Sequence, residues 1–107
     1  MERISEITDG GWVGKPVIDE ASRPVGKVVD VLYDDDTSRT PQWAVVGVGF
    51  FRSQHYVPLA EAYKTHDGRL VVPYDQRVVK QSPKATREHI MTPNVREATA
   101  SHYGVPA

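Results

Sequence analysis

Three consecutive carboxylates, Asp34, Asp35 and Asp36, are the residues whose type and spacing most directly suggest chemistry in this chain. Clustered oxygen ligands are what calcium and magnesium prefer in proteins. A calcium loop of the EF-hand type, however, separates its acids by single residues, contains a glycine and ends in a glutamate, and the residues after Asp36 have none of these features. Neighbouring side chains of a strand also point to opposite faces, so three in a row cannot converge. We therefore favour a solvent-exposed turn and keep a small-ligand or divalent-cation site at these residues as the alternative.

No other group of residues has the spacing of a catalytic or metal site. The chain has no cysteine, which excludes thiolate zinc sites and cysteine nucleophiles. The four histidines, His55, His66, His89 and His102, form no metal-binding pattern such as H-E-x-x-H. No serine lies in G-x-S-x-G, and no glycine-rich phosphate loop is present. We predict a protein that is not an enzyme and has no cofactor or metal, with His55 on the surface of a strand.

Composition predicts a single cytoplasmic domain. The chain has 107 residues, of which 39% are hydrophobic and 25% are charged, and its net charge is −1. Such a balance is typical of a globular protein and gives no overall attraction to nucleic acid. No apolar run approaches the roughly 20 residues that cross a bilayer. The first residues, MERISEITDGGW, lack the basic and apolar regions of a signal peptide.

The apolar pattern of the first three-quarters predicts strands. Runs rich in β-branched residues occur at 13–19, 24–33, 42–50, 54–59 and 69–74, and the strand pattern ends at Ser82-Pro83. The turn His66-Asp67-Gly68 favours a tight hairpin, and the unbroken apolar run of 42–50 favours a central strand. Short strands joined by such turns are typical of a small antiparallel barrel or sandwich. Thr92-Pro93 then predicts the start of a helix over 94–102, with Gly104 as its C-cap.

The order of these segments resembles the PRC-barrel family, whose small β-barrel occurs in the H subunit of photosynthetic reaction centres and in the ribosome maturation factor RimM. The resemblance is carried by an ordered series: WVGKPVID (12–19), PVGKVVDVLYD (24–34), PQWAVV (41–46), YVPL (56–59), VVPY (71–74) and VVKQSP (78–83). The ending SHYG (101–104) resembles the tail of stand-alone bacterial members. One departure is Ala21-Ser22-Arg23, where the family usually has an Asp-Gly type of turn, and this departure puts only the hairpin geometry in question.

The resemblance implies a mainly β fold: a small antiparallel barrel of about six strands with a short C-terminal helix. It divides the chain into an N-terminal arm (1–11), the barrel (12–83), and a linker with the helix (84–107). Family members act as docking or assembly modules, so no catalytic residues carry over. A ribosome-associated, RNA-processing adaptor is a further alternative that the resemblance to RimM implies.

Aromatic residues supply the candidate contact surface. Most of them are expected in the core, but Phe50 and Phe51 are adjacent, so an extended segment would leave one of them outside. With Arg52 beside them they have the composition of an interface hot spot. Tyr103 of the C-terminal helix is a further interface candidate, and that helix docks either on its own barrel or on a neighbour. We therefore predict a module that acts by protein–protein contact, with a homodimer as one form of that contact.

Overall fold

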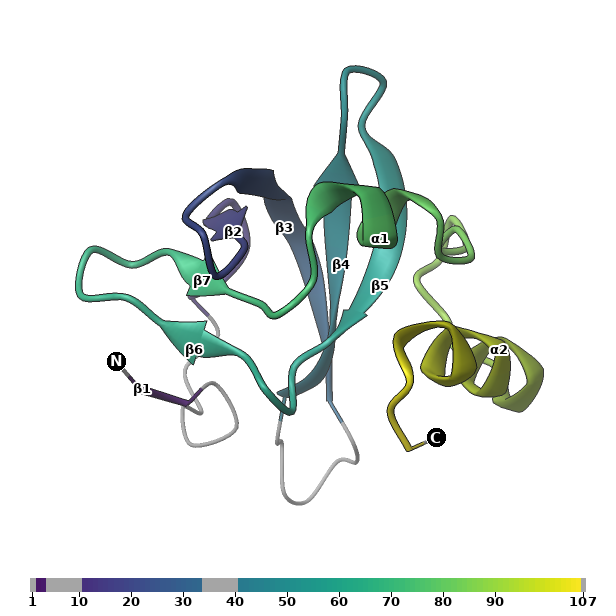
Figure 1. Cartoon of the computed structure of the whole chain (residues 1–107). Helices are drawn as coiled ribbons and strands as arrows, with labels where there is room; N and C mark the ends of the chain where they lie inside the picture. The colour runs from purple at the N-terminus through teal and green to yellow at the C-terminus, as the bar shows by residue number, and fades with distance from the viewer. Residues whose placement is uncertain (1, 4–10, 34–40, 107) are drawn as a thin grey trace.

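The computed structural model describes residues 2–3, 11–33 and 41–106 (Figure 1). In these ranges the elements are β1 Glu2–Arg3, β2 Pro16–Ile18, β3 Pro24–Tyr33, β4 Pro41–Val48, β5 Ser53–Pro58, β6 Tyr63–Lys64, β7 Leu70–Val71, α1 Gln76–Lys80 and α2 Pro93–Tyr103. Strands were predicted at the positions of β2, β3, β4, β5 and β7, and these predictions are confirmed. The acidic run Asp34, Asp35 and Asp36 lies outside the described residues, so neither interpretation of it is tested.

The strands form one mixed sheet in the order β1-β6-β7-β2-β3-β4-β5. The prediction that the strands pair antiparallel is wrong for one pair, because β2 and β7 run parallel, with Val17 opposite Leu70. Parallel neighbours need a long crossover connection, and here the whole of β3 to β6 lies between the two strands in the chain. In the described residues the sheet is also open, since its order begins at β1 and ends at β5.

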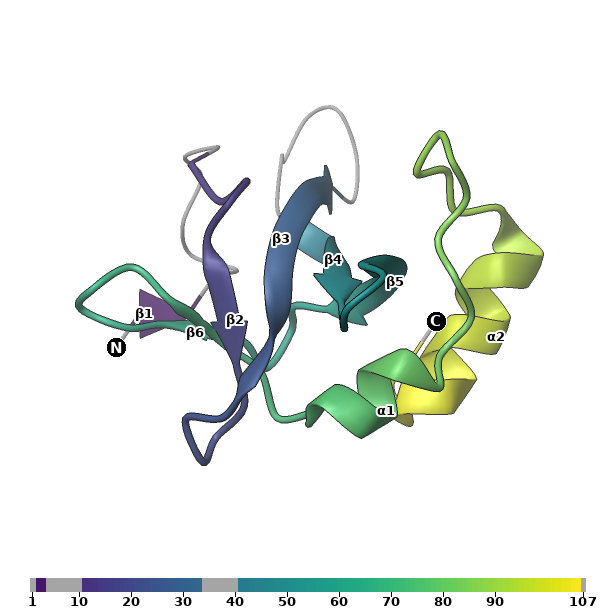
Figure 2. The same cartoon turned by 90° about the horizontal axis from the view of Figure 1, so that it is seen from above.

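The meander β3-β4-β5 is the largest part of the sheet. β4 lies between its two neighbours, with Val46 opposite Val28 on one side and His55 on the other. This placement confirms the central strand that its apolar run predicted. Figure 2 shows β2 to β5 following one another, with α2 on the β5 side of the sheet. The fully buried side chains, each worth about 1.5–3 kcal/mol of burial, include Val17, Val25, Val45, Val46, Val48, Tyr56, Val57, Leu70 and Val72.

The turn between β2 and β3 depends on Asp19. Its Oδ1 accepts hydrogen bonds from the backbone N–H groups of Ala21 and Arg23, both at 2.9 Å. Its Oδ2 lies 3.0 Å from the Arg23 Nε. Ser22 adopts a φ of 64°, a left-handed conformation that favours glycine. The carboxylate of Asp19 thus stabilises the turn at which the chain departs from the Asp-Gly pattern. The hairpin of β2 and β3 forms in spite of this departure.

Residues 76–80 form the helix α1, so the prediction that the strand pattern continues to Ser82 is wrong. The Asp75 side chain accepts a hydrogen bond from the Val78 N–H at 2.9 Å, which caps the first turn of a helix. Val79 is buried within this helix. A single inward-facing residue suits a helix of this length, whereas two adjacent valines in a strand would face opposite sides.

The C-terminal helix α2 confirms its predicted caps and docks on its own chain. The Thr92 hydroxyl accepts a hydrogen bond from the Val95 N–H, and Gly104 ends the helix with a φ of 71°. The His102 Nε2 lies 2.8 Å from the Val78 carbonyl oxygen of α1. Tyr103 is buried, and its ring centroid lies 4.7 Å from that of Tyr74. Neither helix of the described residues is long and apolar enough to cross a membrane.

The segment between the helices covers the outer edge of β5. The Ala85 N–H donates to the Gln54 carbonyl oxygen at 2.8 Å, and Lys84 forms a β-bridge with His55. The Tyr56 hydroxyl donates to the Ile90 carbonyl oxygen at 2.9 Å. Because an uncovered strand edge invites pairing with other chains, this segment directs any contact away from the β5 edge.

Candidate interaction site at the hairpin tip

The tip of the β4–β5 hairpin is a tight turn made of Gly49, Phe50, Phe51 and Arg52 (Figure 1). The Arg52 N–H donates to the Gly49 carbonyl oxygen at 3.2 Å. Gly49 and Arg52 both adopt a positive φ, 77° and 53°. The two phenylalanines therefore occupy the central positions of the turn, which point away from both strands.

Both phenylalanine side chains project into solvent. Phe50 and Phe51 are each 92% exposed, and their ring centroids lie 5.2 Å apart in an edge-to-face arrangement. The prediction that one of them belongs to the core is wrong, because it assumed an extended segment and the residues lie in a turn. Adjacent exposed aromatic rings are typical of contact surfaces, since each ring gains apolar burial when a partner covers it.

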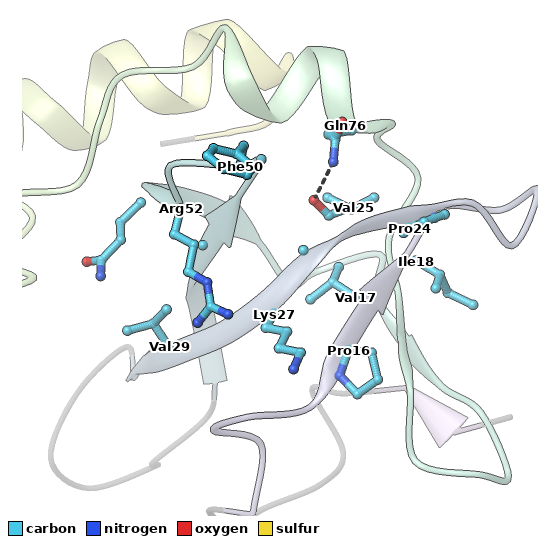
Figure 3. A pocket seen from close by; sticks show the side chains of 14 residues that line it. Pro16, Val17, Ile18, Pro24, Val25, Lys27, Val29, Phe50, Arg52 and Gln76 are labelled. Carbon is cyan, nitrogen blue, oxygen red and sulfur yellow. Dashed lines mark hydrogen bonds between the residues drawn. The ribbon is translucent and has the colours of Figure 1, made fainter.

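A hollow of about 770 Å³ lies next to the tip. Its walls come from β2, β3, the end of β4, the tip, the start of β5 and α1, and Figure 3 shows the side chains. The lining residues are Pro16, Val17, Ile18, Pro24, Val25, Gly26, Lys27, Val29, Gly47, Gly49, Phe50, Arg52, Gln54 and Gln76. The Gln76 Nε2 donates to the Val25 carbonyl oxygen at 3.3 Å and joins α1 to β3 (Figure 3). The site thus combines a protruding apolar tip with a largely apolar recess.

Gly26 makes the close approach of β3 and β4 at this hollow possible. A Cβ on Gly26 would lie 2.2 Å from the Gly47 carbonyl oxygen, far inside van der Waals contact. A Cβ on Gly47, by contrast, would meet nothing nearer than the Val29 Cγ2, at an ordinary 3.5 Å. The close approach of the two backbones therefore requires a glycine at Gly26. Gly47 has room for a Cβ, and its lack of a side chain leaves the bottom of the hollow unfilled.

The charged side chains of the hollow are cationic. Lys27 of β3 and Arg52 of the tip line it, and none of the described residues in its lining is a carboxylate (Figure 3). The Lys80 Nζ lies 3.4 Å from the position that a Cβ on Gly49 would take, so a third cation is next to the tip. Within the described part of the chain, the recorded ion pairs involve none of these three cations.

A serine and a histidine pair just behind the tip. The His55 Nδ1 lies 3.0 Å from the Ser82 carbonyl oxygen, which can only accept, so the proton is on Nδ1. The His55 Nε2 is then the acceptor for the Ser53 hydroxyl at 3.0 Å. His55 is only 2% exposed, so its predicted place on the surface is wrong. Burial lowers the pKa of His55 below its usual 6.5, against the opposing effect of the Ser82 carbonyl.

Asp30 joins the linker to the sheet. Its Oδ1 accepts a hydrogen bond from the Val31 N–H at 2.8 Å, and its Oδ2 lies 3.0 Å from the His89 Nδ1. The His89 Nε2 lies 2.8 Å from the Gln54 side-chain oxygen. The carboxylate thus fixes the segment that follows α1.

The remaining predicted site residues do not come together at the hairpin. Tyr103 is buried in contacts of its own chain, and burial raises the pKa of its hydroxyl to about 12. Among the residues that the structure describes, no group of three histidines or carboxylates is placed to hold a metal ion. Of the residues proposed from the sequence for contact, Phe50, Phe51 and Arg52 are the ones that share one exposed surface.

A family model for the PRC-barrel domain matches residues 5–79, which is more than half of the chain. The chain belongs to the PRC-barrel family. No curated protein matches it with significance. The matched range of this PRC-barrel includes the tip, both glycines of the hollow and α1, while the linker and α2 follow it. The VGKV segment that carried the resemblance contains Gly26, and the contact of this glycine with Gly47 explains physically why that position lacks a side chain.

The hollow itself was missed in the sequence. Val29 and Gln76 line it, but they come from different elements, and nothing in their local pattern marks them. One usable signal was available in Gly26 and Gly47, because glycine inside a strand often marks a close backbone approach or an open floor.

Proposed function

We propose that this PRC-barrel is a non-enzymatic, cytoplasmic docking module that binds a protein partner through Phe50, Phe51 and Arg52. The observation that supports the proposal is the 92% exposure of two adjacent phenylalanines on one protruding turn. Neither phenylalanine belongs to the buried hydrophobic core, which is formed by other residues. Two aromatic rings that do not stabilise the fold are available to gain burial from a partner.

The shape next to the tip supports the same proposal. Hot-spot aromatics bind best where a partner can also surround them and exclude water. The hollow of about 770 Å³ adjoins Phe50, so one partner can contact the protruding tip and fill the recess beside it. The location in the cytoplasm stays a prediction from the composition.

The experiment compares partner capture by three forms of the immobilised protein in lysate of the native cell, with the bound proteins identified by mass spectrometry. The wild type is compared with the double variant Phe50→Ser/Phe51→Ser and with Ile90→Ser. Ile90 is also exposed, at 57%, but belongs to the linker. We expect a reproducible set of proteins to be lost with the double variant and kept with Ile90→Ser. Identical sets from all three forms would refute the tip as the contact site.

The proposal includes a homodimer, in which the protein partner is a second copy of the chain. Contact between two tips would bury four phenylalanine rings, two from each copy. Light scattering coupled to size-exclusion chromatography over a concentration series measures this directly. A monomer at every concentration would contradict the homodimer, and the partner would then be a different protein.

The non-enzymatic part of the proposal is tested at Ser53. Its hydroxyl donates to a neutral imidazole, which is the first step of serine activation in hydrolases. We assign the Ser53–His55 pair a structural role, in which the hydroxyl supplies a hydrogen bond to the ring of a histidine that is only 2% exposed. A fluorophosphonate probe followed by intact-mass measurement is expected to leave the protein unmodified. A stoichiometric adduct that disappears in Ser53→Ala would assign an activated nucleophile instead.

A further inference from the structure

We propose that the hollow beside the tip receives an acidic, apolar segment of the partner protein, whose carboxylates pair with Lys27 and Arg52. This inference rests on the proposed function, because it names the chemistry of what binds there. It joins two observations: the apolar character of the recess and the sign of the charges around it.

The apolar part of the recess selects for an apolar side chain. Val29 in its wall is partly exposed, and the exposed Pro16 and Pro24 extend this apolar surface along β2 and β3. Proline has no N–H to offer, so the two prolines add apolar surface without a backbone donor. An aliphatic or aromatic residue of the partner would gain burial there, next to the ring of Phe50 (Figure 3).

The charged part selects for carboxylates. Figure 3 shows Lys27, from β3, and Arg52, from the tip, at the same hollow, and the lining residues that the structure describes include no acid to neutralise them. Lys80 adds a third cation next to Gly49. Three cations around one apolar recess attract a negatively charged segment and repel a positive one, so their sign contributes to partner choice.

The same charges argue against the tip of a second copy as the occupant of the hollow. The tip carries Arg52, so inserting it into the hollow of another copy would bring that arginine to Lys27 and to the second Arg52. Like charges placed together across an interface are unfavourable. A different protein with an acidic segment avoids this repulsion.

The test uses a randomised dodecapeptide library displayed on phage and selected on the immobilised wild-type protein. We expect the enriched peptides to contain aspartate or glutamate next to leucine, isoleucine or phenylalanine. Synthetic copies of these peptides are then titrated by fluorescence anisotropy against Lys27→Glu/Arg52→Glu, and we expect their affinity to fall by at least about tenfold. The matched control, Lys84→Glu/Arg87→Glu, makes the same change in net charge at two exposed cations outside the lining, and should keep the affinity within about twofold.

The outcomes separate this inference from the proposed function. Peptides without acidic enrichment, or acidic peptides that bind the charge-reversed variant equally well, overturn the inference. If those peptides still need Phe50 and Phe51, the docking function stands without it. A selection that enriches no peptide also overturns the inference. Co-sedimentation of the wild type, but not of Phe50→Ser/Phe51→Ser, with vesicles of phosphatidylglycerol and phosphatidylcholine would then assign the tip to an anionic membrane surface and overturn both.

Discussion

The rings of Phe50 and Phe51 meet edge to face with their centroids 5.2 Å apart, and each side chain is 92% exposed. The two rings contact each other more than they contact the fold. Replacing both with serine is therefore expected to change the free energy of unfolding by no more than about 0.5 kcal/mol, the usual range for surface substitutions. Urea unfolding followed by far-UV circular dichroism measures this change. A loss of 2 kcal/mol or more would show that the tip belongs to the core.

Gly26 and Gly47 lie side by side but should respond differently to alanine. A Cβ at Gly26 would lie 2.2 Å from the Gly47 carbonyl oxygen, so Gly26→Ala forces β3 and β4 apart. We expect a loss of about 1–3 kcal/mol, the usual cost of overpacking. Gly47→Ala meets only an ordinary contact at 3.5 Å and serves as the control. Equal stability of the two variants in urea unfolding would contradict the close approach of the strands.

His55 makes stability depend on pH. Burial lowers the pKa of this histidine below 6.5, so the unfolded chain takes up its proton at a higher pH than the folded chain does. The contribution of His55 is therefore fully present above about pH 6.5, and it is lost as the pH falls below that value, by at most about 1.4 kcal/mol per pH unit. The free energy of unfolding should be lower at pH 5.5 than at pH 7.5.

The variant that tests this pH effect is His55→Gln. It removes the buried titrating group and should flatten the dependence between pH 7.5 and 5.5, although it lowers stability at both values because the bond to the Ser82 carbonyl is lost. A slope that His55→Gln leaves unchanged would place the titrating group elsewhere.

Tyr103 should behave in the opposite way to the tip. It is 9% exposed and packs against Tyr74, so Tyr103→Ala removes a large side chain from the contact that holds α2. We expect a loss of about 3 kcal/mol, as for other buried aromatic residues. Phe51→Ala, which removes an aromatic side chain of similar size from the surface, is the matched control and should be nearly neutral. If the two variants were equally stable, α2 would not be part of the folded unit.

The sequence was sufficient for features that depend on local chemistry. The cap residues Thr92 and Gly104 predicted both ends of α2, because capping needs only neighbouring groups. The Asp67-Gly68 turn predicted a tight hairpin, and Gly68 adopts a φ of 86° between β6 and β7, although no strand was predicted at the position of β6. The unbroken apolar run of β4 predicted its central place. The family resemblance rested on this same ordered set of segments and is confirmed by the match over residues 5–79.

Features that depend on distant contacts could not be predicted in this way. The parallel pairing of β2 with β7 brings Val17 to Leu70, which lie far apart in the sequence, and no local pattern encodes that register. His55 looked like a surface residue because its partner, the Ser82 carbonyl, comes from beyond α1. Both phenylalanines of the tip are exposed because β4 ends before them. The exact residue at which a strand ends is predicted poorly from residue propensities.

The central claim is that the hairpin tip is the surface that a protein partner covers. Titration of ¹⁵N-labelled protein with a captured partner, followed through the amide chemical shifts, tests it most directly. The account predicts that the largest shifts occur at Gly49, Phe50, Phe51 and Arg52, and in the β3 and β4 residues that line the hollow. Shifts confined to the β6–β7 hairpin or to α2, with the tip unchanged, would contradict it.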